Sequence, residues 1–195
     1  MTDVHLKCSC GKVQGCAYDV SPHEGIRIVC YCDHCQAFAK YLGRENDILD
    51  EYGGTDIFQM SPHQISIEKG KNLIRSIRLT KKGPYRWYAD CCKTPIGNTL
   101  HSEVPVVGMI HNFMDDEDKR NKNLGPVRFY VQGKYAQKKL PDEKYNEGFP
   151  LASYLKIMFK VLIWRFSPKK FSSPFFDDTG KPISKPEALY QKTTD

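Results

Sequence analysis

The chain has 195 residues, a hydrophobic content of 40% and a charged content of 27%, values that are ordinary for a globular protein. This length suits one domain with an appendage, and it excludes a minimal fold that depends on cross-links. The sequence opens without an apolar secretory leader, so we expect a cytoplasmic protein. In that compartment clustered cysteines favour metal binding, with disulfides as the alternative for an exported chain.

The net charge of +6 is unevenly distributed along the sequence. Residues 151–195 hold eight Lys or Arg against four Asp or Glu, which leaves +4 of the total in this segment. A nucleic-acid-binding role would need a basic stripe with interleaved aromatic residues or a reading motif, and the sequence shows neither. We therefore expect no nucleic-acid partner.

Short apolar runs separated by turn residues predict a mainly β domain. A helical turn at 36–42, ending at Gly43, interrupts them. The polar, glycine-bearing stretch 44–62 reads as a connection, and 115–123 reads as a solvated loop. The expected strands are a pair within 6–20, followed by 26–30, 64–68, 74–80, 85–88, 104–110 and 127–131.

Residues 151–166 are apolar and free of Pro and Gly, which predicts a helix. At about 1.5 Å per residue it spans roughly 24 Å, short for a membrane crossing. The favoured interpretation is packing on the β body or on a second subunit, which leaves a homo-oligomer open. The alternative is an interfacial membrane helix with Lys156 and Lys160 snorkelling. We expect domain 1–145 and a C-terminal extension 146–195, which ends in an extended, Pro-rich basic arm.

Seven of the eight cysteines fall in three short groups, and Cys16 stands alone as an expected buried apolar residue, with a redox or spare-ligand role as the alternative. Counting ligands predicts two zinc sites. A four-thiolate zinc is saturated and structural, whereas a three-thiolate zinc keeps a position for water or a substrate thiol. The first site would use Cys8, Cys10, Cys91 and Cys92, and the second would use Cys30, Cys32 and Cys35.

The adjacent cysteines Cys91 and Cys92 can share one metal ion only under a condition on the backbone. Adjacent residues on a strand point to opposite faces, so both can bind one ion only where the backbone turns. Without such a turn, Cys92 is the better candidate ligand.

The order of these motifs resembles the family of glutathione-dependent formaldehyde-activating enzyme and centromere protein V over about residues 5–135. Ala89 stands where that family usually has a cysteine, with Cys91 as the available substitute. Gln36 and Ala37 stand where the family has basic residues. The matching motifs are Cys8-Ser9-Cys10-Gly11, Cys30-Tyr31-Cys32-Asp33-His34-Cys35, Ile57-Phe58-Gln59 and Cys92-Lys93-Thr94-Pro95-Ile96.

The resemblance implies a β-tent of several coiled antiparallel sheets, with one structural zinc and a second zinc at Cys30, Cys32 and Cys35. Enzymes of that family join glutathione and formaldehyde into S-(hydroxymethyl)glutathione. We therefore expect a zinc-dependent carbon–sulfur lyase-like protein that forms or breaks a thiol–aldehyde adduct, since a metal-bound thiol is deprotonated. His34 or Asp33 would move the proton, or each is a surface residue in a turn. The competing hypothesis is a non-catalytic zinc module that serves as a binding platform.

Overall fold

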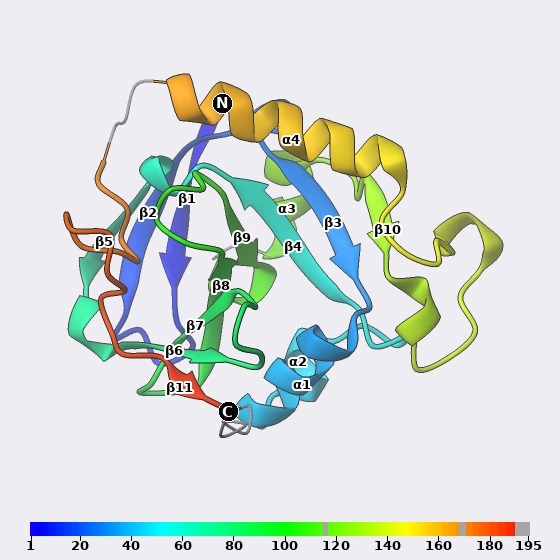
Figure 1. Ribbon diagram of the computed structural model, residues 1–195, viewed down its shortest axis with the longest axis horizontal. Coiled ribbons are helices and arrows are strands. Elements are labelled where there is room, and N and C mark those ends of the chain that lie inside the picture. The colour runs from blue at the N-terminus through cyan, green and yellow to red at the C-terminus, as the bar shows by residue number, and fades with distance from the viewer. Residues whose placement is uncertain (115–116, 168–170, 190–195) are drawn as a thin grey trace.

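The computed structural model describes residues 1–114, 117–167 and 171–189, and it confirms a mainly β chain with a C-terminal helix (Figure 1). The strands form two sheets. The small sheet has the order β1-β2-β5, with bounds Thr2–Lys7, Gln14–Val20 and Ile65–Lys69. The large sheet has the order β10-β3-β4-β9-β8-β7-β6-β11, with bounds Phe129–Val131, Ile26–Cys30, Thr55–Met60, Val107–Ile110, Thr94–Thr99, Tyr85–Ala89, Ile74–Arg78 and Glu187–Ala188.

Antiparallel pairing dominates both sheets, as expected for strands joined by short connections. The two ends of the large sheet differ, because β10 runs parallel to β3 and β11 runs parallel to β6. Both of these end strands come from the later part of the chain. The chain after residue 125 therefore closes the large sheet at each edge.

The main core lies between the two sheets. Leu6 and Ile65 of the small sheet belong to the same buried cluster as Phe58, Trp87 and Met109 of the large sheet. The Trp87 ring is fully buried, and its Nε1–H donates to Thr99 Oγ1 at 2.8 Å. A buried indole N–H that finds a partner in this way adds to the apolar burial without a desolvation penalty.

The C-terminal extension contributes to this core. Phe175 and Phe176 are buried, and their ring centroids lie 5.2 Å and 5.9 Å from that of Trp87. Residues 168–170 and 190–195 of the predicted basic arm lie outside the described residues, as do 115 and 116. The described part of the arm is thus fastened to the large sheet, both by these rings and by β11.

The helices lie outside the sheets (Figure 1). The predicted turn at 36–42 is the end of a longer helix, α1, whose C-cap Gly43 has φ 64°, a conformation that suits glycine. Short 3₁₀ turns occur at 62–64, 71–73, 111–113, 133–135 and 142–144. The helices are α1 (Asp33–Leu42), α2 (Glu45–Ile48), α3 (Glu117–Leu124) and α4 (Leu151–Phe166).

Two predicted connections are regular structure instead. The stretch 44–62 contains α2 and β4. The prediction of a loop over 115–123 is wrong from Glu117 onward, where helix α3 begins. A polar anchor holds α3: the buried Arg27 donates to Asn121 Oδ1 at 2.7 Å and to Gly125 O at 2.8 Å, while it also pairs with Asp56. A helix that is fixed by hydrogen bonds rather than by an apolar stripe leaves no periodic signal in the sequence.

Helix α4 spans Leu151–Phe166, the range that the sequence predicts. Ser153 and Trp164 are its buried residues, and Ile157 packs against the apolar cluster that contains Cys30 and Cys35. A search of the described residues finds no helix long and apolar enough to cross a membrane.

Candidate metal centres

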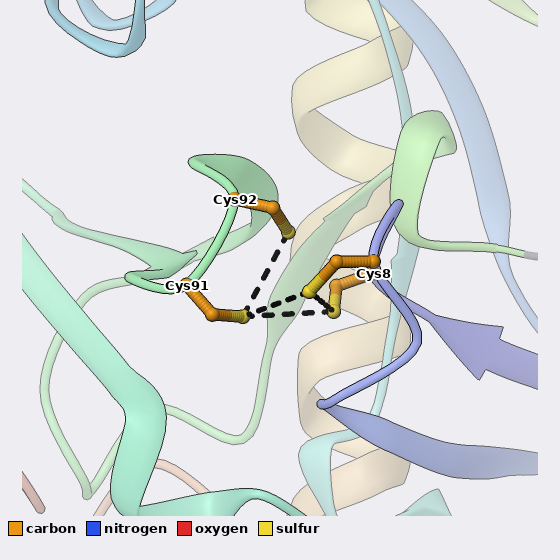
Figure 2. A group of neighbouring side chains, drawn as sticks. Cys8, Cys91 and Cys92 are labelled. Carbon is orange, nitrogen blue, oxygen red and sulfur yellow. Dashed lines mark hydrogen bonds between the residues drawn. The ribbon is translucent and has the colours of Figure 1, made fainter.

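Two hairpin turns from different sheets bring four sulfur atoms together. Cys8 and Cys10 lie in the turn between β1 and β2, and Cys91 and Cys92 lie in the turn between β7 and β8. The four Sγ atoms are all within 4.8 Å of one another, and we name this group the four-cysteine cluster. Figure 2 shows the sulfurs of Cys8, Cys91 and Cys92 directed toward one another.

The sulfur–sulfur distances in this cluster fit one shared ion. A tetrahedral zinc with Zn–S bonds near 2.3 Å places its sulfurs about 3.8 Å apart. The distances from Cys91 Sγ are 3.9 Å to Cys8, 3.3 Å to Cys10 and 3.8 Å to Cys92. Cys8 and Cys10 are 3.6 Å apart. Three of these distances lie within about 0.2 Å of the expected edge of a zinc tetrahedron, and the distance between Cys10 and Cys91 is shorter.

The backbone turns where the adjacent pair Cys91-Cys92 requires it. Strand β7 ends at Ala89, the Cys92 N–H donates to Ala89 O at 3.4 Å, and Lys93 has φ 56° in the left-handed region. An ion pair between Lys93 and Asp90 spans the same turn. Both sulfurs therefore face the cluster, and Cys91 joins it as fully as Cys92.

Hydrogen bonds surround the four-cysteine cluster. The Val13 N–H donates to Cys8 Sγ at 3.2 Å, and Thr94 Oγ1 lies 3.1 Å from Cys92 Sγ. Burial raises the pKa of Cys8 and of Cys91. Burial also raises the pKa of Cys92, but hydrogen bonds from Ser9 and Thr94 outweigh it and lower that pKa to about 5. These hydrogen bonds therefore favour the thiolate form of Cys92.

A second group of sulfurs lies where β3 passes into α1. Cys30 is the last residue of β3, Cys32 is the N-cap of α1, and Cys35 lies in the first turn of that helix. Their Sγ atoms are within 4.8 Å of one another, with Cys32 and Cys35 3.2 Å apart. We name this group the three-cysteine cluster. Cys30 and Cys35 are buried, whereas Cys32 is only half-buried, so solvent reaches the cluster from the Cys32 side.

The helix start explains why the spacing C-x-C-x-x-C converges. The Cys35 N–H, in the first turn of the helix, donates to Cys32 O at 3.0 Å and also lies 3.4 Å from Cys32 Sγ, which caps the helix. The first turn of the helix then brings the Cys35 sulfur back toward those of Cys30 and Cys32. The helix N-terminus also carries a partial positive charge, which favours thiolates at this position.

A buried arginine lies against the three-cysteine cluster. Arg86 of β7 has a relative exposure of 4%, and its Nη1 lies 3.8 Å from Cys35 Sγ and 3.3 Å from Asn98 Oδ1. In the part of the chain that the structure describes, the ion pairs between basic and acidic side chains do not include Arg86. Because a buried cation needs a compensating charge, the thiolates of the cluster are its natural partners.

The protons in this cluster are shared unequally. Hydrogen bonds from Cys30 and Cys32 lower the pKa of Cys35 well below its ordinary value, and the charge of Arg86 lowers it further against the effect of burial. Hydrogen bonds with Cys32 and Cys35, together with burial, raise the pKa of Cys30. The guanidinium of Arg86, 3.8 Å from Cys35 Sγ, therefore favours the thiolate form of Cys35.

The remaining predicted residues lie outside both clusters. The His34 side chain is exposed on the first turn of α1, where its backbone N–H donates to Asp33 Oδ1 at 2.8 Å. Cys16 is buried in β2, as expected for a small apolar residue, and belongs to neither group of sulfurs. Neither position contradicts the roles considered from the sequence, but neither side chain is part of a cluster.

Three polar residues beside the clusters were not identified from the sequence. Arg86 looks like an ordinary strand cation, and Thr94 like part of a turn motif. Arg44 donates from Nη1 to Ser9 Oγ and to Cys92 O, each at 3.0 Å, and thereby ties the α1–α2 connection to the four-cysteine cluster. Only the three-dimensional pairing of distant segments reveals these contacts.

Fold and sites together define a mainly β protein with two sulfur clusters that can hold metal ions. The donor set consists of thiols alone, which suits soft or borderline metals such as zinc rather than magnesium or calcium. The chain matches the profile of a family of unknown function (DUF6151) over residues 1–187, and it belongs to that family. No curated protein matches the chain.

Proposed function

We propose that the chain binds two zinc ions and that the three-cysteine cluster is a catalytic site of the carbon–sulfur lyase type. The substrate class is a thiol and an aldehyde, or the adduct that they form, such as S-(hydroxymethyl)glutathione. The observation that carries the proposal is the difference in ligand number, because one cluster has four sulfurs and the other has three. A zinc with three protein ligands keeps a position for substrate. The resemblance to the formaldehyde-activating family supports the same assignment.

The residues of the three-cysteine cluster fit a zinc ion by their chemistry. A zinc held by Cys30, Cys32 and Cys35 would supply a Lewis-acidic position that binds a substrate thiol as its thiolate. Three thiolates and one divalent ion leave a single negative charge, which Arg86 balances at 3.8 Å from Cys35 Sγ. The half-buried Cys32 marks the side from which substrate approaches.

The reaction that we propose is an addition without a redox step. The substrate sulfur forms a bond to the aldehyde carbon, the carbonyl π bond breaks, and the proton lost by the thiol ends on the aldehyde oxygen. The reverse reaction breaks the carbon–sulfur bond and returns the proton. His34, exposed one position before Cys35, is the residue that we assign to proton movement.

One observation favours the competing function, a zinc module that serves only as a binding platform. The Gln36 side chain occupies a position that is basic in the formaldehyde-activating family, and its Nε2 donates to Tyr31 O and Tyr135 O, both at 2.8 Å. These bonds tie α1 to the segment after β10 and leave the amide engaged within the protein. Glutathione carboxylates would therefore need other partners, and a smaller thiol is an equally suitable substrate.

Exchange spectroscopy tests the proposal. The rate of exchange between ¹³C-formaldehyde and its thiol adduct is measured by NMR with the two-zinc protein and glutathione, cysteine or mercaptoethanol. We expect the wild-type protein to accelerate exchange for at least one thiol, Cys32→Ser to lose the effect, and Cys16→Ala to retain it. Wild-type protein that carries two zinc ions and accelerates none of the three reactions would favour the platform and overturn the lyase proposal.

A further inference from the structure

The outer face of α4 is a continuous apolar stripe. Its exposed large side chains follow one another at spacings of three and four residues, so they line one side of the helix from its first residue to its last. Two central members, Leu155 and Phe159, have relative exposures of 57% and 63%. The exposed residues are Leu151, Tyr154, Leu155, Met158, Phe159, Leu162, Ile163 and Phe166.

The opposite face of α4 fixes the orientation of this stripe. Ser153 and Trp164 are buried, Ile157 packs against the apolar cluster beside β3, and Arg165 Nη1 donates to Glu103 O at 3.3 Å. The helix lies along the outer edge of the molecule in Figure 1, so the stripe faces away from the body. Scattered exposed apolar residues are normal on a protein surface, but a contiguous stripe of this length indicates an interaction site.

The charges on α4 select the partner. The helix carries Lys156, Lys160 and Arg165 and no acidic residue. At 3.6 residues per turn, the two lysines lie to one side of the stripe, whereas the Arg165 guanidinium is bonded to Glu103 O on the body. A second copy of the helix would add two more lysines and no acid of its own to pair with them. An anionic lipid surface complements both the apolar stripe and its lysine margin.

We propose that α4 docks this protein on an anionic membrane surface, with the stripe among the lipid acyl chains and the ammonium groups of Lys156 and Lys160 at the level of the phosphates. The long aliphatic stems of these side chains allow their charges to reach the headgroup region while the helix lies in the interface. At about 1.5 Å per residue, a helix of this length lies in the interface plane rather than across a bilayer. The inference is independent of the chemistry proposed for the cysteine clusters.

Vesicle flotation of the full chain tests the docking site. Wild-type protein is mixed with vesicles of phosphatidylcholine alone, or of phosphatidylcholine with phosphatidylglycerol, and the bound fraction is measured. The double variant Leu155→Glu/Phe159→Glu changes two side chains that already face solvent. The matched control is Leu189→Glu, which alters a leucine with 40% exposure that directly follows β11 in the chain. Strand β11 and helix α4 lie at opposite edges of the molecule in Figure 1. Unchanged circular dichroism and zinc content show that each variant is folded.

We expect wild type and Leu189→Glu to float with anionic vesicles and the double variant to remain unbound. Lys156→Gln/Lys160→Gln should weaken binding about fivefold for each charge removed, and raised salt should weaken it too. Failure of wild type to bind anionic vesicles, or equal binding by the double variant, overturns the proposal. So does light scattering that shows a lipid-independent dimer split by the double variant, because a second copy would then cover the stripe.

Discussion

The two cysteine clusters differ in how far apart their ligands lie along the chain. The four-cysteine cluster joins Cys8 to Cys91 across 83 residues and links a turn of the small sheet to a turn of the large one. The three-cysteine cluster is local, from Cys30 to Cys35, and lies against the buried cation of Arg86. A cross-link that closes a long loop constrains the unfolded chain more than one that closes a short loop. We therefore propose that the first cluster stabilises the fold and that the second carries the chemistry.

The largest expected effect is the loss of the four-cysteine metal. Treated like a disulfide of the same loop length, the cross-link from Cys8 to Cys91 contributes about 4.5 kcal/mol, against about 2 kcal/mol for a link from Cys30 to Cys35. We expect the double variant Cys91→Ser/Cys92→Ser, which leaves only Cys8 and Cys10 in the cluster, to lower the free energy of unfolding by about 4–5 kcal/mol, measured by urea denaturation. Cys16→Ala, which alters a buried cysteine outside both clusters, should cost about 1 kcal/mol. Equal losses in the two variants would contradict a structural role for the cluster.

Cys32→Ser tests the role of the three-cysteine cluster, as the preceding variant tests the role of the four-cysteine cluster. With one of three sulfurs removed, we expect the chain to lose one zinc and its thiol–aldehyde activity, while the free energy of unfolding falls by only about 2 kcal/mol. The measurement is zinc per chain by native mass spectrometry, combined with denaturation of the same sample. A chain that keeps both ions, or that unfolds as readily as Cys91→Ser/Cys92→Ser, would contradict the proposed division of roles.

The charge of Arg86 should matter only at the three-cysteine cluster. Arg86→Met keeps an unbranched apolar stem but removes the cation beside Cys35, so we expect zinc affinity at this cluster to fall about 10–100-fold. Competition with a chromogenic chelator measures the two affinities. The matched control is Arg44→Met, which should spare the three-cysteine cluster because Arg44 contacts Ser9 and Cys92 instead. Unchanged affinity in Arg86→Met would show that the guanidinium does not balance the thiolates.

Thr94→Val should produce the smallest change, in the pH at which the four-cysteine cluster releases its metal. The hydrogen bonds of Thr94 and Ser9 lower the pKa of Cys92 to about 5, so this sulfur resists protonation as the pH falls toward that value. Without the threonine hydroxyl the pKa rises toward its ordinary value, and release should begin at a higher pH. Zinc retained after dialysis across pH 4–8 measures the shift, with release from the three-cysteine cluster as the internal reference. A midpoint that stays in place, or moves to lower pH, would contradict the role given to Thr94.

Local patterns predicted some parts of this fold and could not predict others. Strand 26–30 and helix 151–166 were found because apolar runs and breakers define them without help from the rest of the chain. Strand β4 was missed because it lies inside the large sheet, where Thr55 is buried and the apolar alternation is lost. Strand β8 was missed because it contains Pro95 and Gly97, both of which normally argue against a strand.

The metal-site residues show the same contrast between features that local sequence predicts and features that depend on distant segments. The cysteine groups could be found because their spacing is itself the signal, and their convergence followed from ligand counting. The turn that brings Cys91 into the four-cysteine cluster depends on a left-handed backbone conformation at Lys93. A lysine gives no signal of that conformation in the sequence. Arg86 could not be distinguished from a surface cation, since β7 is buried on both faces and shows no polar–apolar alternation.

The most direct test of this account is the number of zinc ions and disulfides in the native protein. Native mass spectrometry of the freshly purified chain, followed by alkylation under denaturing conditions, gives both numbers from one sample. The account predicts two zinc ions per chain and eight cysteines that all react as free thiols. A chain without bound metal, or one whose clustered cysteines resist alkylation because they form disulfides, would contradict it.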